Sequence, residues 1–174
     1  MAFTFAACSN KGDYTALDGS RGPLVIYPDY KEVTIPANIA PLNFHYVMKN
    51  IGKVKTTFTL GGKSVTVKGT EVEWPVRKWK SFIDGAEGQI MTISAKAVID
   101  GQNVTDSWNV TVSADPIDGY LTYRLIEPSY QMFNEISIEE RCIEDFSETT
   151  ICDYKITDNS CMNCHTHTQG RGDL

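Results

Sequence analysis

Apolar and polar residues alternate over most of residues 23–112, which is the pattern of β-strands that bury one face. Short strands are predicted at 24–27 and 33–35, and longer ones at 42–48, 54–60, 64–68, 91–99 and 104–112. Gly61-Gly62 and Asp100-Gly101 separate two pairs of these segments and predict hairpin turns, because glycine tolerates positive φ angles.

About seven short strands with a turn roughly every 8–12 residues are typical of a β-sandwich of the immunoglobulin or fibronectin kind. The Cys…Trp…Cys spacing of antibody domains is missing, so that class is excluded. We therefore predict an all-β protein with a lipoprotein signal remnant and linker over 1–22, a sandwich domain over 23–114 and an irregular C-terminal segment over 115–174.

The composition of residues 115–174 differs from that of the predicted sandwich. One or two strands are expected in 116–128, a turn and one strand in 129–140, and irregular structure with a short strand near Tyr154 in 142–159. No closing element follows, so we expect this segment to be incomplete.

Composition and charge exclude some functions. The formal net charge of −6 argues against a nucleic-acid partner, because a phosphate backbone is bound by a basic surface. The acidic residues are scattered without an obvious acid/base pair, and neither a Gly-x-Ser-x-Gly motif nor a phosphate-binding loop occurs. The sequence therefore gives little support to an enzyme.

The most specific motif is Cys161-Met162-Asn163-Cys164-His165. C-x-x-C-H attaches c-type haem: two thiols add to the porphyrin vinyl groups, and the histidine offers its imidazole to the iron. Two intervening residues let both sulfurs reach one porphyrin edge. We therefore predict haem c held by Cys161, Cys164 and His165, and a role in electron transfer.

The sixth iron ligand is less determined. Met132 is the preferred candidate because it lies in the same segment as the motif. His167 is too close to His165 to reach the other face of the haem, and His45 is expected on the outward side of its strand.

The other cysteines are consistent with export. Phe5-Ala6-Ala7-Cys8 resembles a bacterial lipobox, in which the cysteine is acylated, although fewer residues precede it than a secretory signal needs. A chance cysteine is the alternative. Lipidation of Cys8 and haem at the motif would leave Cys142 and Cys152 as a predicted disulfide, as expected in an oxidising compartment.

Two other interpretations of the cysteines stay open. Four thiolates could bind zinc, with His165 or His167 as a substitute ligand: Cys142, Cys152, Cys161 and Cys164. The cysteines could instead form structural disulfides without a cofactor. Separately, Trp74, Trp79 and Tyr130 could form a sugar-stacking surface, although such residues usually seal a sandwich.

Segments 114–130, 138–141 and 159–165 resemble the N-terminal part of Bacteroidetes envelope lipoproteins that carry a TolB-like β-propeller behind a single C-x-x-C-H. The resemblance implies thioether links at Cys161 and Cys164 and iron ligation by His165. It also implies that the C-terminal segment is the start of a propeller, although the chain stops soon after the motif.

Two functions are predicted. The first is a lipid-anchored c-type haem protein of the cell envelope, on the periplasmic side or at the outer membrane, that exchanges electrons with a redox partner or another envelope protein. The second is a non-catalytic binding or scaffolding lipoprotein whose sandwich recognises a polysaccharide or a protein, with structural cysteines.

Overall fold

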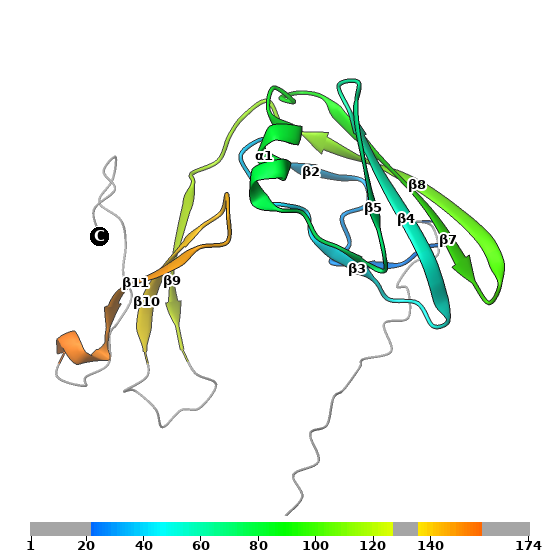
Figure 1. Cartoon of the computed structure of the whole chain (residues 1–174). Helices are drawn as coiled ribbons and strands as arrows, with labels where there is room; N and C mark the ends of the chain where they lie inside the picture. Colours follow the sequence, from blue (N-terminus) through cyan, green and yellow to red (C-terminus); the bar gives the residue numbers. More distant parts are fainter. Residues whose placement is uncertain (1–21, 127–135, 158–174) are drawn as a thin grey trace, which may run out of the picture. The chain divides into compact units, whose positions relative to one another are not determined.

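The computed structural model describes residues 22–126 and 136–157, which form mainly antiparallel strands (Figure 1). The strands are β1 (Ile26–Tyr27), β2 (Val33–Ile35), β3 (Phe44–Tyr46), β4 (Ile51–Leu60), β5 (Lys63–Lys68), β6 (Glu71–Val72), β7 (Ile90–Ile99), β8 (Gln102–Val112), β9 (Tyr120–Leu125), β10 (Ser137–Cys142) and β11 (Glu148–Asp153). A helix, α1 (Val76–Ile83), and a 3-10 turn, η3 (Tyr154–Thr157), complete the described elements. The predicted all-β class is confirmed.

The strands form three sheets, with the orders β1-β3-β6, β2-β8-β7-β4-β5 and β11-β10-β9. By its internal contacts the chain divides into two compact units. Among the described residues, the first unit comprises 22–33, 43–73 and 90–111, and the second comprises 34–42, 74–89, 112–126 and 136–157.

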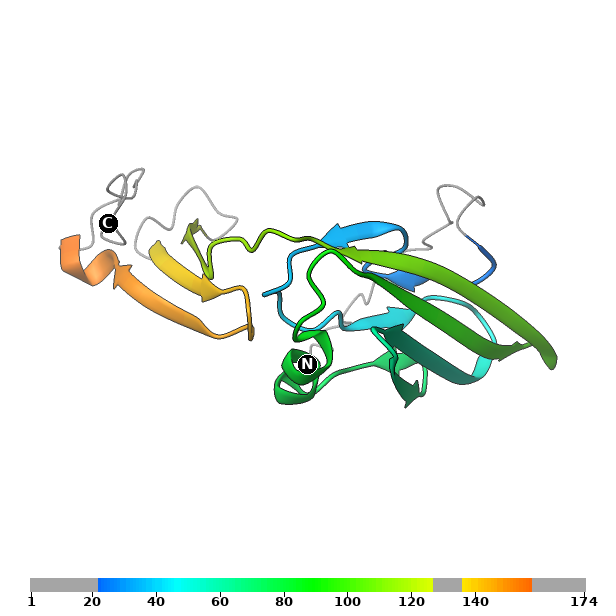
Figure 2. The ribbon, with the colours of Figure 1, turned by 90° about the horizontal axis from the view of Figure 1, so that it is seen from above.

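The core of the first unit follows the predicted alternation. In β4 and β7, every second side chain is buried: Val54, Thr56, Phe58, Leu60, Met91, Ile93, Ala95 and Ala97. The long β7–β8 hairpin, green in Figure 1 and Figure 2, turns at Asp100-Gly101 as predicted, and both turn residues have positive φ.

The three-stranded sheet β1-β3-β6 packs against the buried face of the five-stranded sheet. The ring of Phe44 in β3 lies 6.4 Å from that of Phe58 and 6.2 Å from that of Trp108. Nearby, the hydroxyls of Tyr46 and Thr56 are 2.7 Å apart, which satisfies the buried threonine. Burial raises the pKa of Tyr46 to about 12. The likeness to immunoglobulin or fibronectin domains stays a prediction.

The second unit contains a helix in a stretch for which the sequence pattern predicted no helix and no strand. Pro75, with extended backbone angles, precedes α1, and Trp79, Phe82 and Ile83 fill one buried face at helical spacing. The Trp79 indole N–H donates to the Ile39 carbonyl at 2.9 Å. Burial of this apolar face therefore decides the local structure in favour of a helix.

The C-terminal sheet is more regular than the sequence predicted. Strands β10 and β11 form an antiparallel hairpin, and β9 pairs with the other side of β10. The strand expected near Tyr154 ends at Asp153, and Tyr154 itself begins η3. That this sheet starts a β-propeller stays a prediction.

Candidate functional site

The residues of the predicted cofactor site lie outside the described part of the chain. This holds for the motif residues Cys161, Cys164 and His165, for the candidate ligand Met132, and for Cys8. Haem attachment, iron ligation and lipidation therefore stay predictions. The structure instead places Cys142, Cys152, His45 and several polar clusters.

No disulfide joins Cys142 to Cys152 in this structure, so the predicted disulfide between them is wrong. The register pairs Cys152 in β11 with Ile138 in β10, and Ile138 lies four residues before Cys142. Four residues of strand span about 13 Å. A disulfide needs Cα atoms within about 7 Å, so the two thiols are too far apart to bond.

The two cysteines have different surroundings. Cys152 packs beside the buried side chains of Ile136 and Ile138. The Cys142 thiol donates a hydrogen bond to Asp145 in the β10–β11 turn. The Ser147 hydroxyl and amide donate to the same carboxylate at 2.6 and 3.0 Å, and these bonds, with that of Cys142, hold the pKa of Asp145 below its usual value. Cys142 thus helps to fix a turn.

A second polar group lies on the exposed surface of the C-terminal sheet. The Tyr123 hydroxyl donates to Glu148 at 2.6 Å, and Arg141 Nη1 lies 3.1 Å from the same carboxylate oxygen. The hydrogen bond from Tyr123 lowers the pKa of Glu148 and raises the pKa of Tyr123. These charges are mutually compensated, so the group joins strands rather than offering a nucleophile.

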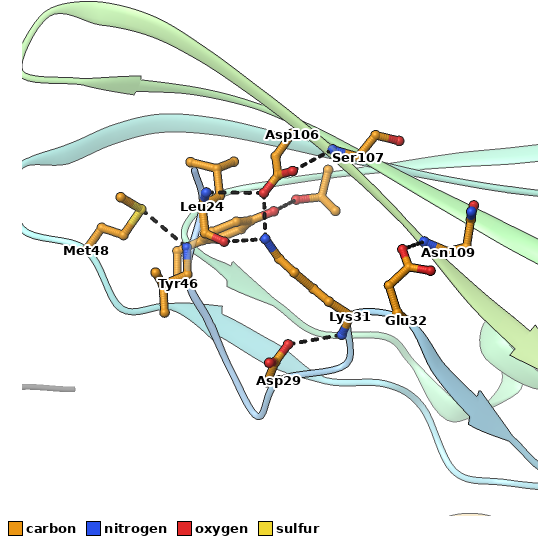
Figure 3. A network of polar contacts seen from close by, with 11 residues as sticks. Leu24, Asp29, Lys31, Glu32, Tyr46, Met48, Asp106, Ser107 and Asn109 are labelled. Atoms are coloured by element: carbon orange, nitrogen blue, oxygen red, sulfur yellow. Dashed lines mark hydrogen bonds and ion pairs between the residues drawn. The ribbon is translucent and has the colours of Figure 1, made fainter. Parts of the chain in front are cut away.

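A buried lysine lies at the centre of the network in Figure 3. Lys31, only 3% exposed, places its ammonium 2.5 Å from the Asp106 carboxylate and 2.5 Å from the Leu24 carbonyl oxygen. The same ammonium lies 4.9 Å from the centre of the Trp108 ring. The other oxygen of Asp106 accepts the Ser107 amide N–H at 2.8 Å. The lysine is surrounded by acceptors, so its role is structural.

The sequence contains a signal for this pair. Asp106 occupies an inward position of the alternation that also includes Val104, Trp108 and Val110. A carboxylate at such a position requires a buried cationic or hydrogen-bonding partner. The pattern could therefore have predicted the partner's charge, although not that it comes from Lys31.

The outer face of the five-stranded sheet carries an ordered array of polar side chains. Cross-strand pairing aligns three rows over β5, β4, β7 and β8: Ser64, Thr59, Thr92 and Asn109; Thr66, Thr57, Ser94 and Ser107; and Lys68, Lys55, Lys96 and Thr105. All of these side chains are exposed or half-buried. We call these three rows the hydroxyl–lysine face.

Hydrogen bonds between neighbouring strands hold parts of this face in place. The hydroxyls of Thr57 and Thr66 are 2.9 Å apart, and the Thr92 hydroxyl donates to the Asn109 side-chain oxygen at 3.1 Å. Asn103 and Asn109, which each begin an Asn-x-Thr sequence, lie at exposed positions of β8.

The two tryptophans proposed for sugar stacking are not available for it. Trp74 is 6% exposed and Trp79 is fully buried, and their rings pack together 5.5 Å apart. Tyr130 lies outside the described residues. His45 is exposed in β3, as expected, with its ring 5.7 Å from that of Tyr27.

One shallow hollow in the second unit, of about 180 Å³, is lined by residues 37–39, part of α1, Glu87 and Glu144. Its charged groups include Lys80 and Glu144, whose side chains pair at 3.2 Å on the surface. The lining contains no serine, cysteine or histidine, so it offers no hydroxyl or thiol nucleophile paired with an imidazole base. Within 22–126 and 136–157, no cluster of three metal-binding side chains occurs.

Comparison with known proteins adds no family: no family model, no curated protein and no solved structure matches this chain. Among the described helices, none has the length and apolar character needed to span a bilayer.

Proposed function

We propose that this chain is an exported, lipid-anchored c-type haem protein that transfers electrons in the bacterial envelope. The observation that carries the proposal is the sequence Cys161-Met162-Asn163-Cys164-His165. Its donor set, two thiols and one imidazole at the C-x-x-C-H spacing, fits covalent haem attachment. Bound haem would supply one-electron redox chemistry, while His165 would bind its iron.

The structure weakens the main metal alternative. A four-thiolate zinc site needs every sulfur at about 2.3 Å from one ion. The β10–β11 register separates Cys142 and Cys152 by four residues of strand, so one ion cannot bind both. Cys161, Cys164 and His165 alone are the set that haem attachment uses.

The visible spectrum of the matured protein tests this proposal. The full chain is expressed in a host with a cytochrome c maturation system, and the spectrum is recorded before and after reduction. We expect the sharp reduced-state bands of a c-type haem that resist extraction by acidic solvent. In the Cys161→Ser/Cys164→Ser variant these bands should be lost, while Cys142→Ser/Cys152→Ser should keep them. A wild-type chain without such bands, beside a working positive control, contradicts the proposal.

A second candidate function is supported by the first unit. We propose that the β-rich module recognises an envelope partner, either a polysaccharide or a protein. The supporting observation is the hydroxyl–lysine face, a broad exposed surface with ordered polar side chains. The described residues show no catalytic cluster beside it, so recognition fits this surface better than catalysis.

The lipid anchor and the position in the envelope rest on Cys8. Radiolabelled palmitate should label the chain in a bacterial host that exports it, and Cys8→Ala should not be labelled. Labelling that persists in the Cys8→Ala variant would contradict this part of the proposal.

A further inference from the structure

Three lysines lie side by side on the hydroxyl–lysine face. The register places Lys55 in β4 directly opposite Lys68 in β5 and directly opposite Lys96 in β7. Neighbouring strands are about 4.8 Å apart, so the row extends across roughly 10 Å of the sheet. All three side chains are exposed, and Lys53, close by on β4, is exposed as well.

In the part of the chain that the structure describes, no carboxylate compensates the positive charge of this lysine row. None of the three lysines forms an ion pair there with a carboxylate. No acidic residue belongs to the three rows. Glu32 contacts the row farthest from the lysines, where its carboxylate accepts the backbone N–H of Asn109 at 2.9 Å. Like charges directly opposite one another destabilise a sheet. A chain of net charge −6 thus carries a row of positive charge at one end of the hydroxyl–lysine face.

We propose that the hydroxyl–lysine face binds an acidic polysaccharide, a glycan chain that carries carboxylate or sulfate groups. The lysine row would pair with the repeated anionic groups. The two adjacent rows of serine, threonine and asparagine side chains can donate hydrogen bonds to sugar hydroxyls and accept them. This inference rests on the second candidate function, recognition by the β-rich module, and is independent of haem attachment.

The composition of the face favours a glycan over other polyanions. Single-stranded nucleic acids are bound by aromatic side chains that stack on bases, and the three rows contain no aromatic residue. Peripheral membrane surfaces combine lysines with aromatic or aliphatic side chains that enter the lipid, and the rows contain none of these. Hydroxyl rows next to a lysine row match a ligand that carries both hydroxyl and anionic groups.

The hydrogen bonds between strands strengthen the argument. Thr57 with Thr66 and Thr92 with Asn109 are linked side chain to side chain, so part of their rotamer freedom is already lost before a ligand binds. Preorganised groups bind at lower entropic cost. Because the charges are solvent-exposed, the affinity should fall as salt is added.

Binding of the full chain to defined polymers tests the proposal. The probes are polygalacturonate, a sulfated glycosaminoglycan, neutral dextran, single-stranded DNA and vesicles with an anionic lipid. The test variant is Lys55→Gln/Lys68→Gln/Lys96→Gln. The control variant, Arg77→Gln/Lys78→Gln/Lys155→Gln, removes the same charge from exposed positions elsewhere in the chain.

The wild-type chain and the control should bind a carboxylated or sulfated polysaccharide. The test variant should bind it about tenfold more weakly, since three exposed ion pairs are lost. Thr57→Val/Thr66→Val, which keeps every charge, should weaken binding about threefold. The acidic polymer should raise the unfolding temperature of wild type more than that of the test variant, and a cooperative unfolding transition of the test variant without polymer shows that it is folded.

Any one of the following results would overturn the inference. The test variant could lose no more affinity than the control, DNA or anionic vesicles could bind as tightly as the acidic polysaccharides, or neutral dextran could bind in their place. Binding to dextran alone would reject the acidic glycan while leaving a recognition module. A haem-bearing chain that binds none of the polymers would reject this inference and leave the haem proposal intact.

Discussion

The sheet β2-β8-β7-β4-β5 has most of its large apolar side chains on one covered face, with Ile90 and Val65 as exceptions, whereas the sheet β11-β10-β9 leaves several of its own in solvent. In the first, Phe58, Met91 and Ile93 are fully buried. In the second, Leu121 and Leu125 on β9 are 55% and 46% exposed, and the described buried cluster consists of Ile136 and Ile138 with Cys152 beside them.

This difference indicates where the folding energy comes from. Burial of apolar surface is the main favourable term in folding, and a small sheet with few buried side chains is marginal alone. The first unit should therefore account for most of the stability of the described chain. The C-terminal sheet depends more on its polar links, such as that between Tyr123 and Glu148.

The largest expected effect is the loss of a core ring. Phe58→Ala should lower the free energy of unfolding of the first unit by about 3–5 kcal/mol, because Phe58 is fully buried and its loss leaves a cavity. Leu121→Ala, at a position 55% exposed in β9, should change the free energy of unfolding of the second unit by less than about 0.5 kcal/mol. Urea unfolding followed by tryptophan fluorescence measures both. Equal losses of stability in the two variants would contradict the difference in burial between the two sheets.

A slightly smaller effect is expected at the buried ion pair. Lys31→Met should destabilise the first unit by about 3 kcal/mol, because it leaves the Asp106 carboxylate buried without its cation. The double variant Lys31→Met/Asp106→Leu, which removes both charges, should recover most of that loss. The same urea titration decides the matter, and a double variant no more stable than the single one would count against this account.

A weaker, pH-dependent effect is expected in the C-terminal sheet. The pKa of Glu148 lies below its usual value of 4.5, chiefly through the hydrogen bond from Tyr123. A lowered carboxyl pKa contributes stability that is present above pH 4.5 and is lost as the pH falls through the folded-state pKa.

Tyr123→Phe should therefore raise the pKa of Glu148 towards 4.5 and reduce this acid dependence. NMR titration of the Glu148 carboxyl carbon measures the shift, and Thr122→Val on the same strand is the control. An unchanged pKa in Tyr123→Phe would show that the hydrogen bond does not control it.

Mild oxidation should have no effect on the cysteine pair of the C-terminal sheet, the smallest effect predicted. After mild oxidation and digestion without reductant, mass spectrometry should find no peptide that links Cys142 to Cys152, because the register keeps them about 13 Å apart. Recovery of that linked peptide in high yield would mean that the β10–β11 register is wrong.

The strands of the first unit could be predicted because their pattern has period two and their turns carry glycine, as at Gly61-Gly62. Helix α1 was missed because its eight residues are too few for a clear helical period, and its buried Trp79 and Phe82 also suit strand ends.

The disulfide prediction failed because sequence spacing does not give strand register, and register sets the distance between Cys142 and Cys152. The hydroxyl–lysine face could be predicted strand by strand from alternating polar residues. That Lys55, Lys68 and Lys96 share one row required the pairing of three strands.

The intact mass of the mature chain, purified from a host that performs cytochrome c maturation, tests the central claim most directly. The account predicts the mass of the polypeptide and its lipid plus one covalently bound haem, with the added mass carried by the peptide that contains Cys161 and Cys164. A mature chain that weighs only its amino acids and lipid would contradict it.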